Sequence, residues 1–470
     1  MACTTGVCQS GCYKEDDDEA MEFERRSESA TTTTANGSAS LPVKEDSDHR
    51  NLCFKCKVDE AITGDEAHLC LGCFRSSLFG KFKFSVTSHD MINPFDNILV
   101  AFSGGPSSRV VLQFVHEMQQ KAQRNFDASR DRSLPVFGVG VAFIDETVIS
   151  SIPSHEYEKA IQDIRLIVSS LAPPEKKLHI VPIENIYSLD SKGETSRLKE
   201  LLHAIDDDTG KEDLVHHLHM MSLQKIALDN GYNKLVLGSC ASRIACHVIS
   251  ATVKGQGYSL PADIQYVDAR WEIPVVLPLR DCLIQELNMI CSHDSLKIVK
   301  QLDGSGSGIN VLVSSFVTLL QKENPSRERT IVRTAEKLTP FHFNRLPETD
   351  DPNNHVSSRR RHKKFNPKSN ESIPSELFCP ICNSPLNKVD SERLKSNLRH
   401  CETSADILGI SCCSSCQFQI LPKKSSSKEH FYSLLPQPMI DRAKYHISRD
   451  QDLLREQIKD FLLSEDENGT

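Results

Sequence analysis

Apolar residues in the middle of the chain alternate between two spacings. Short, continuous apolar runs, typical of buried parallel strands, are separated by segments in which apolar residues recur every three or four positions, as on one helix face. Strands are predicted at 98–102, 135–143, 178–182, 235–238 and 273–278, and helices at 107–123, 154–171, 213–230, 242–254 and 279–292. The alternation predicts an α/β fold with a doubly wound parallel sheet over residues 91–300.

A glycine-rich turn follows the first of these strands. Gly104 and Gly105 tolerate unusual backbone angles, and Pro106 suits the first position of a helix, where no backbone N–H is needed. Free N–H groups and the helix dipole at such a start favour an anion. The candidate phosphate-binding residues are Ser103, Gly104, Gly105, Ser107 and Ser108. A tight connection that binds nothing is the alternative, because so short a motif does not decide between the two.

Ligands of doubly wound sheets bind beyond the carboxyl ends of the strands. The turn at Ser103, the acid at Asp145 and the turn at Gly238 each follow a predicted strand, so we expect them to share one rim. Nearby, the run Phe79 to Phe84 interleaves aromatic residues with lysines. An amphipathic edge that links the zinc ribbon to the next domain is the favoured interpretation of this run, and an RNA contact is the alternative.

Two sets of paired CxxC motifs flank the α/β segment. Each set offers four thiolates at a spacing typical of tetrahedral zinc, and a closed shell of four thiolates indicates a structural site. Unligated thiols are the alternative, and Cys401 or Cys412 is a spare thiol beside the second set. The predicted ligands are Cys53, Cys56, Cys70 and Cys73 in the first set, and Cys379, Cys382, Cys413 and Cys416 in the second.

The composition of the chain indicates its cellular compartment but not its binding partner. The 470 residues include 17 cysteines and show neither a signal peptide nor an apolar run long enough for a membrane helix, so we expect a cytoplasmic protein without a membrane. The formal net charge is −9, of which residues 1–50 carry −6. The nearly neutral remainder neither supports nor excludes nucleic-acid binding, because phosphate contacts respond to local charge.

The chain is predicted to consist of seven segments. They are a disordered acidic leader (1–50), an N-terminal zinc ribbon (51–80), the α/β domain (91–300), a helical extension (301–345), a basic polar linker (346–372), a C-terminal zinc-ribbon-like module (373–435) and a helical tail (436–470).

Several motifs resemble those of known nucleotide enzymes. AFSGGPSSR (101–109) resembles the pyrophosphate loop SGGxDS of ATP pyrophosphatases, with Ser107 in place of the aspartate. LVLGSCASRIACHVIS (235–250) resembles the LGHNADD segment of thiolating relatives, with Ser239 for the histidine and Ser242 and Arg243 for the acids. KGQGYSLPAD (254–263) and VVLPLRDCLIQEL (275–287) are similar to the glycine turn and the PLxxxxxxE segment. In this order, over residues 51–435, the motifs resemble the cytoplasmic tRNA 2-thiolation protein 2 family.

The resemblance implies a degenerate PP-loop fold, similar to adenine nucleotide α-hydrolases, in a subunit of the cytosolic thiouridylase. It implies 2-thiolation of the wobble uridine of tRNAs for Lys, Glu and Gln, an active paralogous partner, and sulfur from a thiocarboxylated ubiquitin-related modifier. Active relatives carry a CxxC before a helix where this chain has Leu214 to Met221 without cysteine. We therefore predict no catalytic residue, and we expect Cys240 and Cys282 to be buried small hydrophobic residues rather than sulfur carriers.

Two other functions stay open at this point. One is an active ATP pyrophosphatase with another substrate, and the other is a zinc-ribbon adaptor without nucleotide binding. The sequence leaves open whether ATP binds and which surface meets tRNA.

Overall fold

The computed structural model describes residues 52–62, 68–129, 134–150, 152–187, 194–299, 308–344, 377–397 and 403–445. The predicted leader, the basic linker and the tail beyond Tyr445 lie outside these residues. The chain divides into the units Met1–Leu52 and Cys53–Thr470, and every helix and strand given below belongs to the second unit.

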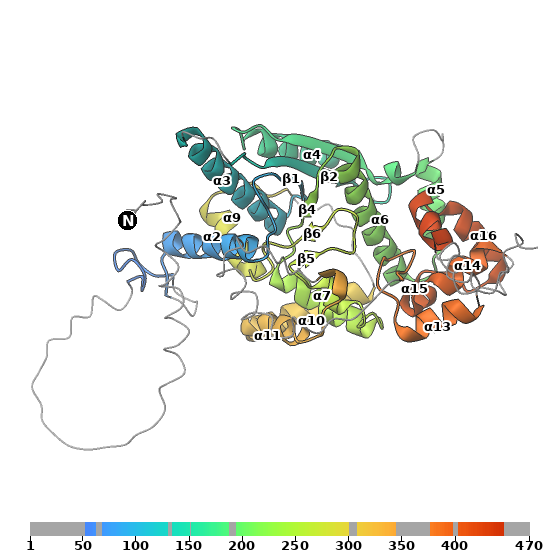
Figure 1. Cartoon of the computed structure of the whole chain (residues 1–470). Coiled ribbons are helices and arrows are strands. Elements are labelled where there is room, and N and C mark those ends of the chain that lie inside the picture. The colour runs from blue at the N-terminus through green and yellow to red at the C-terminus, as the bar shows by residue number, and fades with distance from the viewer. Residues whose placement is uncertain are drawn as a thin grey trace, which may run out of the picture. The chain divides into compact units, whose positions relative to one another are not determined.

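A six-stranded sheet forms the centre of the described part of the chain, in the order β3-β2-β1-β4-β6-β5 (Figure 1). The neighbouring strands pair in parallel except for β5, which runs antiparallel to β6 at the edge. The strands are β1 (Asn97–Ala101), β2 (Gly138–Asp145), β3 (Lys177–Pro182), β4 (Lys234–Val236), β5 (Val267–Asp268) and β6 (Val275–Val276). Chain order reverses between β1 and β4, as in a doubly wound sheet, so the predicted fold class is confirmed.

Helices connect the strands close to where the sequence predicts them. They are α3 (Pro106–Ala128), α4 (Ser154–Ser169), α6 (Asp208–Asp229), α7 (Ala241–Val253) and α9 (Ile284–His293). Helix α9 begins later than its predicted start at 279, because the chain first turns through hydrogen bonds from Arg280 N to Leu277 O and from Cys282 N to Leu279 O. Shorter elements complete the domain: η1 (Ile183–Ile186), α5 (Glu194–His203) and α8 (Leu260–Asp263).

The core lies on both faces of the sheet. Along β1, Leu99 belongs to one buried cluster and its neighbours Ile98 and Val100 belong to the other, because successive side chains of a strand point to opposite faces. The first cluster includes Leu218 of α6, and the second includes Phe114 of α3. Burial on both faces explains why these strands are continuous apolar runs in the sequence.

The aromatic run at 79–84 lies in helix α2 (Leu71–Ser88). Phe82 is fully buried, and the rings of Phe79 and Phe82 lie 5.1 and 5.4 Å from the ring of Phe114 on α3. The run is helical and packs on the α/β domain, which agrees with the favoured interpretation of an amphipathic link between the ribbon and that domain. The helix thus attaches the first cysteine set to the α/β domain.

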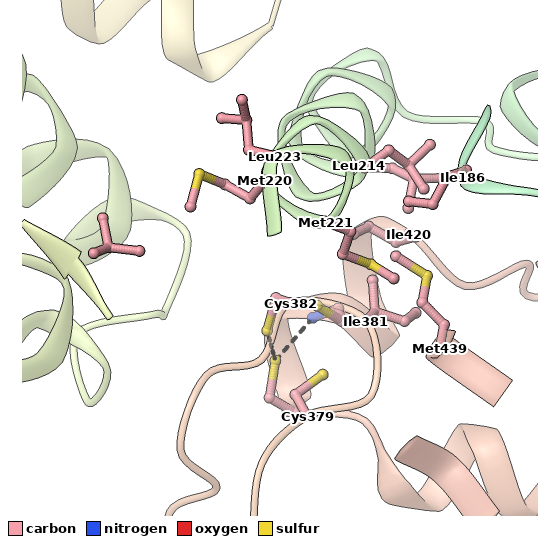
Figure 2. Packing of buried hydrophobic residues seen from close by; sticks show 14 of the residues in the cluster. Ile186, Leu214, Met220, Met221, Leu223, Cys379, Ile381, Cys382, Ile420 and Met439 are labelled. Carbon is pink, nitrogen blue, oxygen red and sulfur yellow. Dashed lines mark hydrogen bonds between the residues drawn. The ribbon is translucent and has the colours of Figure 1, made fainter. Parts of the chain in front are cut away.

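The C-terminal half of the chain packs on helices of the same domain. Helices α10 (Ile309–Glu323) and α11 (Ser326–Ala335) both contact α7. The second cysteine module consists of α13 (Lys388–Asn397), α14 (Ser404–Ser411), α15 (Ser414–Gln419) and α16 (Ser425–Leu434), with one β-bridge between Phe378 and Pro385. Met221 of α6 points toward Ile420 and Met439, so this module shares a core with the α/β domain (Figure 2). Among the described residues, helices that are both long and apolar enough to span a bilayer are absent.

Candidate functional site

The first cysteine set is assembled by a knuckle and a helix start. A hydrogen bond from Lys57 N to Cys53 O closes the knuckle, and Cys70 caps α2 by accepting a hydrogen bond from Cys73 N at 3.4 Å. The sulfur atoms of Cys56 and Cys70 are 3.8 Å apart, and all four sulfur atoms of the set lie within 4.8 Å of one another. Burial raises the pKa of Cys53, but nearby backbone N–H groups outweigh it and lower that pKa to about 6.

The second cysteine set lies in the core shared with the α/β domain. Its sulfur atoms also lie within 4.8 Å of one another, and those of Cys382 and Cys413 are 3.7 Å apart. Figure 2 shows Cys379 and Cys382 beneath α6. Cys379 and Cys416 are at most 1% exposed. The spare thiol of Cys412 is fully buried beside this set, whereas Cys401 falls outside the described residues. The structure thus brings together all eight predicted cysteines as two groups of four.

The glycine turn lies where the sequence places it, between β1 and α3. Gly104 has φ +83°, a backbone conformation that favours glycine, and Val299 N donates a hydrogen bond to Gly104 O at 3.0 Å. A methyl group added to Gly104 would lie 2.8 Å from Val299 Cβ. The Val299 side chain therefore covers the face of Gly104 on which a side chain would stand.

The start of α3 is covered from a second direction. A methyl group added to Gly238 would lie 2.8 Å from Ser108 N, so the turn after β4 packs directly on the first turn of α3. The Ser107 hydroxyl points to the Cys240 sulfur at 3.7 Å, and the Ser108 hydroxyl donates to Gly105 O at 3.0 Å. Of the five candidate phosphate-binding residues, Ser103 is exposed and the other four are buried.

A carboxylate that the sequence reasoning missed lies at the same rim. The Ser242 hydroxyl, in the first turn of α7, donates to Glu328 Oε2 at 2.6 Å and accepts a hydrogen bond from Ile284 N at 3.1 Å. Glu328 comes from α11 and is 2% exposed. Burial raises its pKa, against smaller opposing effects of Ser242 and of the Arg329 charge. An acid 86 residues away in the sequence thus lies beside the position where the chain has Ser242 instead of an acid, and the sequence held no signal for it beyond a helical spacing.

The other candidate groups at the rim are engaged by neighbours. Asp145 accepts hydrogen bonds from Tyr157 Oη at 2.5 Å and from Thr147 N at 2.9 Å. Cys240 and Cys282 are at most 1% exposed, and burial raises the pKa of Cys282, in line with their prediction as small core residues. His219 of α6 pairs with Glu146 at 2.6 Å. The four-membered groups that could hold a metal ion in the described part of the chain include none of the α6 histidines.

Comparison with known proteins identifies relatives along almost the whole chain. The family model described as cytoplasmic tRNA 2-thiolation protein 2 matches residues 308–407. The cytoplasmic tRNA 2-thiolation protein 2 of Arabidopsis thaliana is 54% identical over 474 residues, which cover 99% of each chain. The protein of that name from Oryza sativa subsp. indica is 54% identical over 420 residues, or 89% of this chain and 90% of the relative. Protein 2-B of Xenopus laevis is 23% identical and covers 89% of this chain and 96% of its own.

Similarity to solved structures is weak. U34-tRNA thiolase NcsA from Methanococcus maripaludis, with its 4Fe–4S cluster, aligns with a TM-score of 0.45 and 15% identity over 61% of this chain and 86% of that chain. A likeness at this level carries no argument about function. The near-complete relatives from the two plants do carry one: the chain belongs to the cytoplasmic tRNA 2-thiolation protein 2 family.

Proposed function

We propose that this chain is the non-catalytic subunit of a cytoplasmic complex that 2-thiolates the wobble uridine of tRNAs for Lys, Glu and Gln. The relatives are named for cytoplasmic tRNA 2-thiolation, which supports the reaction and the compartment. The observation that carries the non-catalytic role is the rim of the sheet. Among the described residues its groups bond to one another, which supports a chain without an adenylation site.

Adenylation of a carbonyl oxygen releases pyrophosphate, whose charge is normally neutralised by a metal ion held by carboxylates. At the loop, the neutral Ser107 stands where such a carboxylate is expected, and it points to Cys240. The Glu328 carboxylate lies nearby but accepts from Ser242 and is buried. An anion already held at the first turn of α7 would repel a second one, so this geometry supports a chain that neither binds ATP tightly nor adenylates uridine.

Zinc is the metal proposed for the two cysteine sets. Tetrahedral zinc with Zn–S bonds of about 2.3 Å requires sulfur atoms roughly 3.8 Å apart. The distances of 3.8 Å for Cys56–Cys70 and 3.7 Å for Cys382–Cys413 meet this requirement. All the donors are thiols, so both sites would be closed and structural. They would hold the first knuckle on α2 and the second module against α6.

The remaining chemistry would come from partners. An active paralogous subunit would adenylate the uridine and handle the sulfur, which a thiocarboxylated ubiquitin-related modifier would supply. This chain would complete the tRNA-binding surface of that subunit. A zinc-bearing adaptor that binds no nucleotide is the second candidate function. The hydrogen-bonded rim favours this adaptor over an active ATP pyrophosphatase with another substrate.

Mass spectrometry of tRNA from cells that lack the chain tests the proposal. We expect 2-thiouridine to disappear from the wobble position of the three tRNAs and to return when the wild-type chain is supplied. The Ser107→Ala variant should restore it as well, because the hydroxyl has no catalytic task. Normal 2-thiouridine in the deletion cells would refute the function, and failure of Ser107→Ala as a normally folded protein would refute the non-catalytic assignment.

A further inference from the structure

Helix α10 exposes a stripe of large apolar side chains. Leu312, Phe316 and Leu319 are 69%, 50% and 59% exposed. They are spaced four and three residues apart, so they lie on one face of the helix. Val311 on the same helix is 40% exposed, and four of the eighteen large hydrophobic residues exposed in the described part of the chain thus belong to this single element. Scattered exposed leucines need no explanation, but a continuous stripe marks an interaction surface.

The opposite face holds α10 firmly on the α/β domain. Val313 and Val317 are at most 6% exposed, and α10 packs along α7. At the start of the helix, Ile309 N donates to Thr209 Oγ1 at 3.0 Å. The side chain of Asn310 accepts from Ser250 at 2.7 Å and donates to Asp213 at 3.1 Å. The exposed stripe therefore lies on a helix that the rest of the domain already holds in place. Binding of a partner would not have to pay the entropy cost of ordering this helix.

The charge pattern identifies the class of partner. Residues 309–321 contain no charged side chain, and Lys322 is the first after them. RNA needs cations against its phosphates, and an anionic membrane surface attracts basic faces. The adjoining helix α11 does carry arginines, but Arg327 pairs with Glu323 and Arg329 pairs with Glu286. The stripe itself is uncharged, so it loses little solvation when an apolar surface covers it. Anchors separated by four and three residues are those of a helix that docks in a protein groove.

We propose that Leu312, Phe316 and Leu319 form the docking surface for the catalytic subunit of the thiolation complex. The identity of the partner rests on the proposed function, since a chain with a closed rim contributes to catalysis only through another subunit. The evidence that the stripe is a protein-docking surface is the exposure of its side chains and the absence of charge among them. A second copy of this chain and the chain's own residues 446–470 are the competing occupants.

Titration of the full-length chain with the purified catalytic subunit tests the inference. The Leu312→Gln/Phe316→Gln/Leu319→Gln variant should bind about 100-fold more weakly, because buried apolar anchors dominate such interfaces. Leu166→Gln/Leu228→Gln is the matched control, since these residues are 61% and 41% exposed on other helices, and it should bind like the wild type. The circular dichroism and melting temperature of both variants should match the wild type, because the substituted side chains are exposed.

The outcomes separate the inference from the proposed function. If the wild type binds and the triple variant binds equally well, the docking surface is wrong while the proposed function stands. If the wild type does not bind the catalytic subunit, both fail. A wild-type homodimer that the triple variant converts to monomer would assign the stripe to a second copy. A chemical cross-link between Lys322 and Lys459 that persists in the heterodimer would assign it to the chain's own tail.

Discussion

The cysteine sets and the rim of the sheet both gather polar groups from distant parts of the sequence, yet they do so in opposite ways. In each cysteine set, four donors of one kind converge on one point. At the rim, different groups pair off: Ser107 with Cys240, Ser242 with Glu328, and Val299 with Gly104. Convergent donors that only a cation can satisfy indicate a ligand, whereas mutually satisfied groups indicate a closed site.

This difference indicates that the cysteine sets bind a ligand and that the rim does not. Each cysteine set has the four donors that a structural metal site needs, whereas the described groups at the rim bond to one another.

The largest expected effect comes from removing the metal at the second cysteine set. The wild type should carry about two zinc ions, and Cys382→Ser should carry about one and lose more than about 4 kcal/mol in the free energy of unfolding, since the site lies in the shared core. Cys56→Ser, at the partly exposed first set, should cost less. Elemental analysis and chemical denaturation measure both. A purified wild type without zinc would remove the distinction between the two regions.

Adding a methyl group inside the closed rim should come next. Gly238→Ala forces Cβ against the Ser108 backbone and should cost about 1–3 kcal/mol by overpacking, and Gly104→Ala should cost about 1 kcal/mol more because of its positive φ. Gly257→Ala is the control, since nothing lies within 4 Å of its added Cβ. Denaturant unfolding gives the three values. If Gly238→Ala is as stable as the control, the rim is open rather than closed.

Removing the Glu328 carboxylate should destabilise the fold less than Gly104→Ala and about as much as Gly238→Ala. Glu328→Ala leaves the buried Ser242 hydroxyl without its acceptor and should cost about 1–3 kcal/mol. Glu323→Ala, at an exposed residue of α10, should change stability by less than about 0.5 kcal/mol. Equal effects of the two substitutions would mean that the Ser242 contact contributes nothing to closing the rim.

The smallest expected effect is a pH dependence. The folded chain raises the pKa of Glu328, so its proton is bound more tightly when folded than when unfolded. The stability that this proton contributes is present below the unfolded-state pKa of about 4.3 and is lost as the pH rises through the higher folded value. The wild type should therefore lose stability relative to Glu328→Gln across that window in denaturation series. A difference that stays constant with pH would show that Glu328 has an ordinary pKa.

Much of the fold was predictable, because a parallel sheet encodes its buried strands and amphipathic helices locally. Predicted strand 98–102 is observed as Asn97–Ala101, and predicted helix 154–171 as Ser154–Ser169. The short antiparallel strand Val267–Asp268 was missed because two residues carry no periodicity. The cysteine sets were predictable from spacing. The partner of Ser242 was not, since it depends on how α11 packs on α7.

ATP–pyrophosphate exchange by the purified chain, measured with and without the catalytic subunit, tests the central claim most directly. The closed rim predicts no exchange above background for the chain alone and exchange by the heterodimer that is insensitive to Ser107→Ala in this chain. Exchange by the isolated chain, reduced by Ser107→Ala, would contradict the non-catalytic assignment.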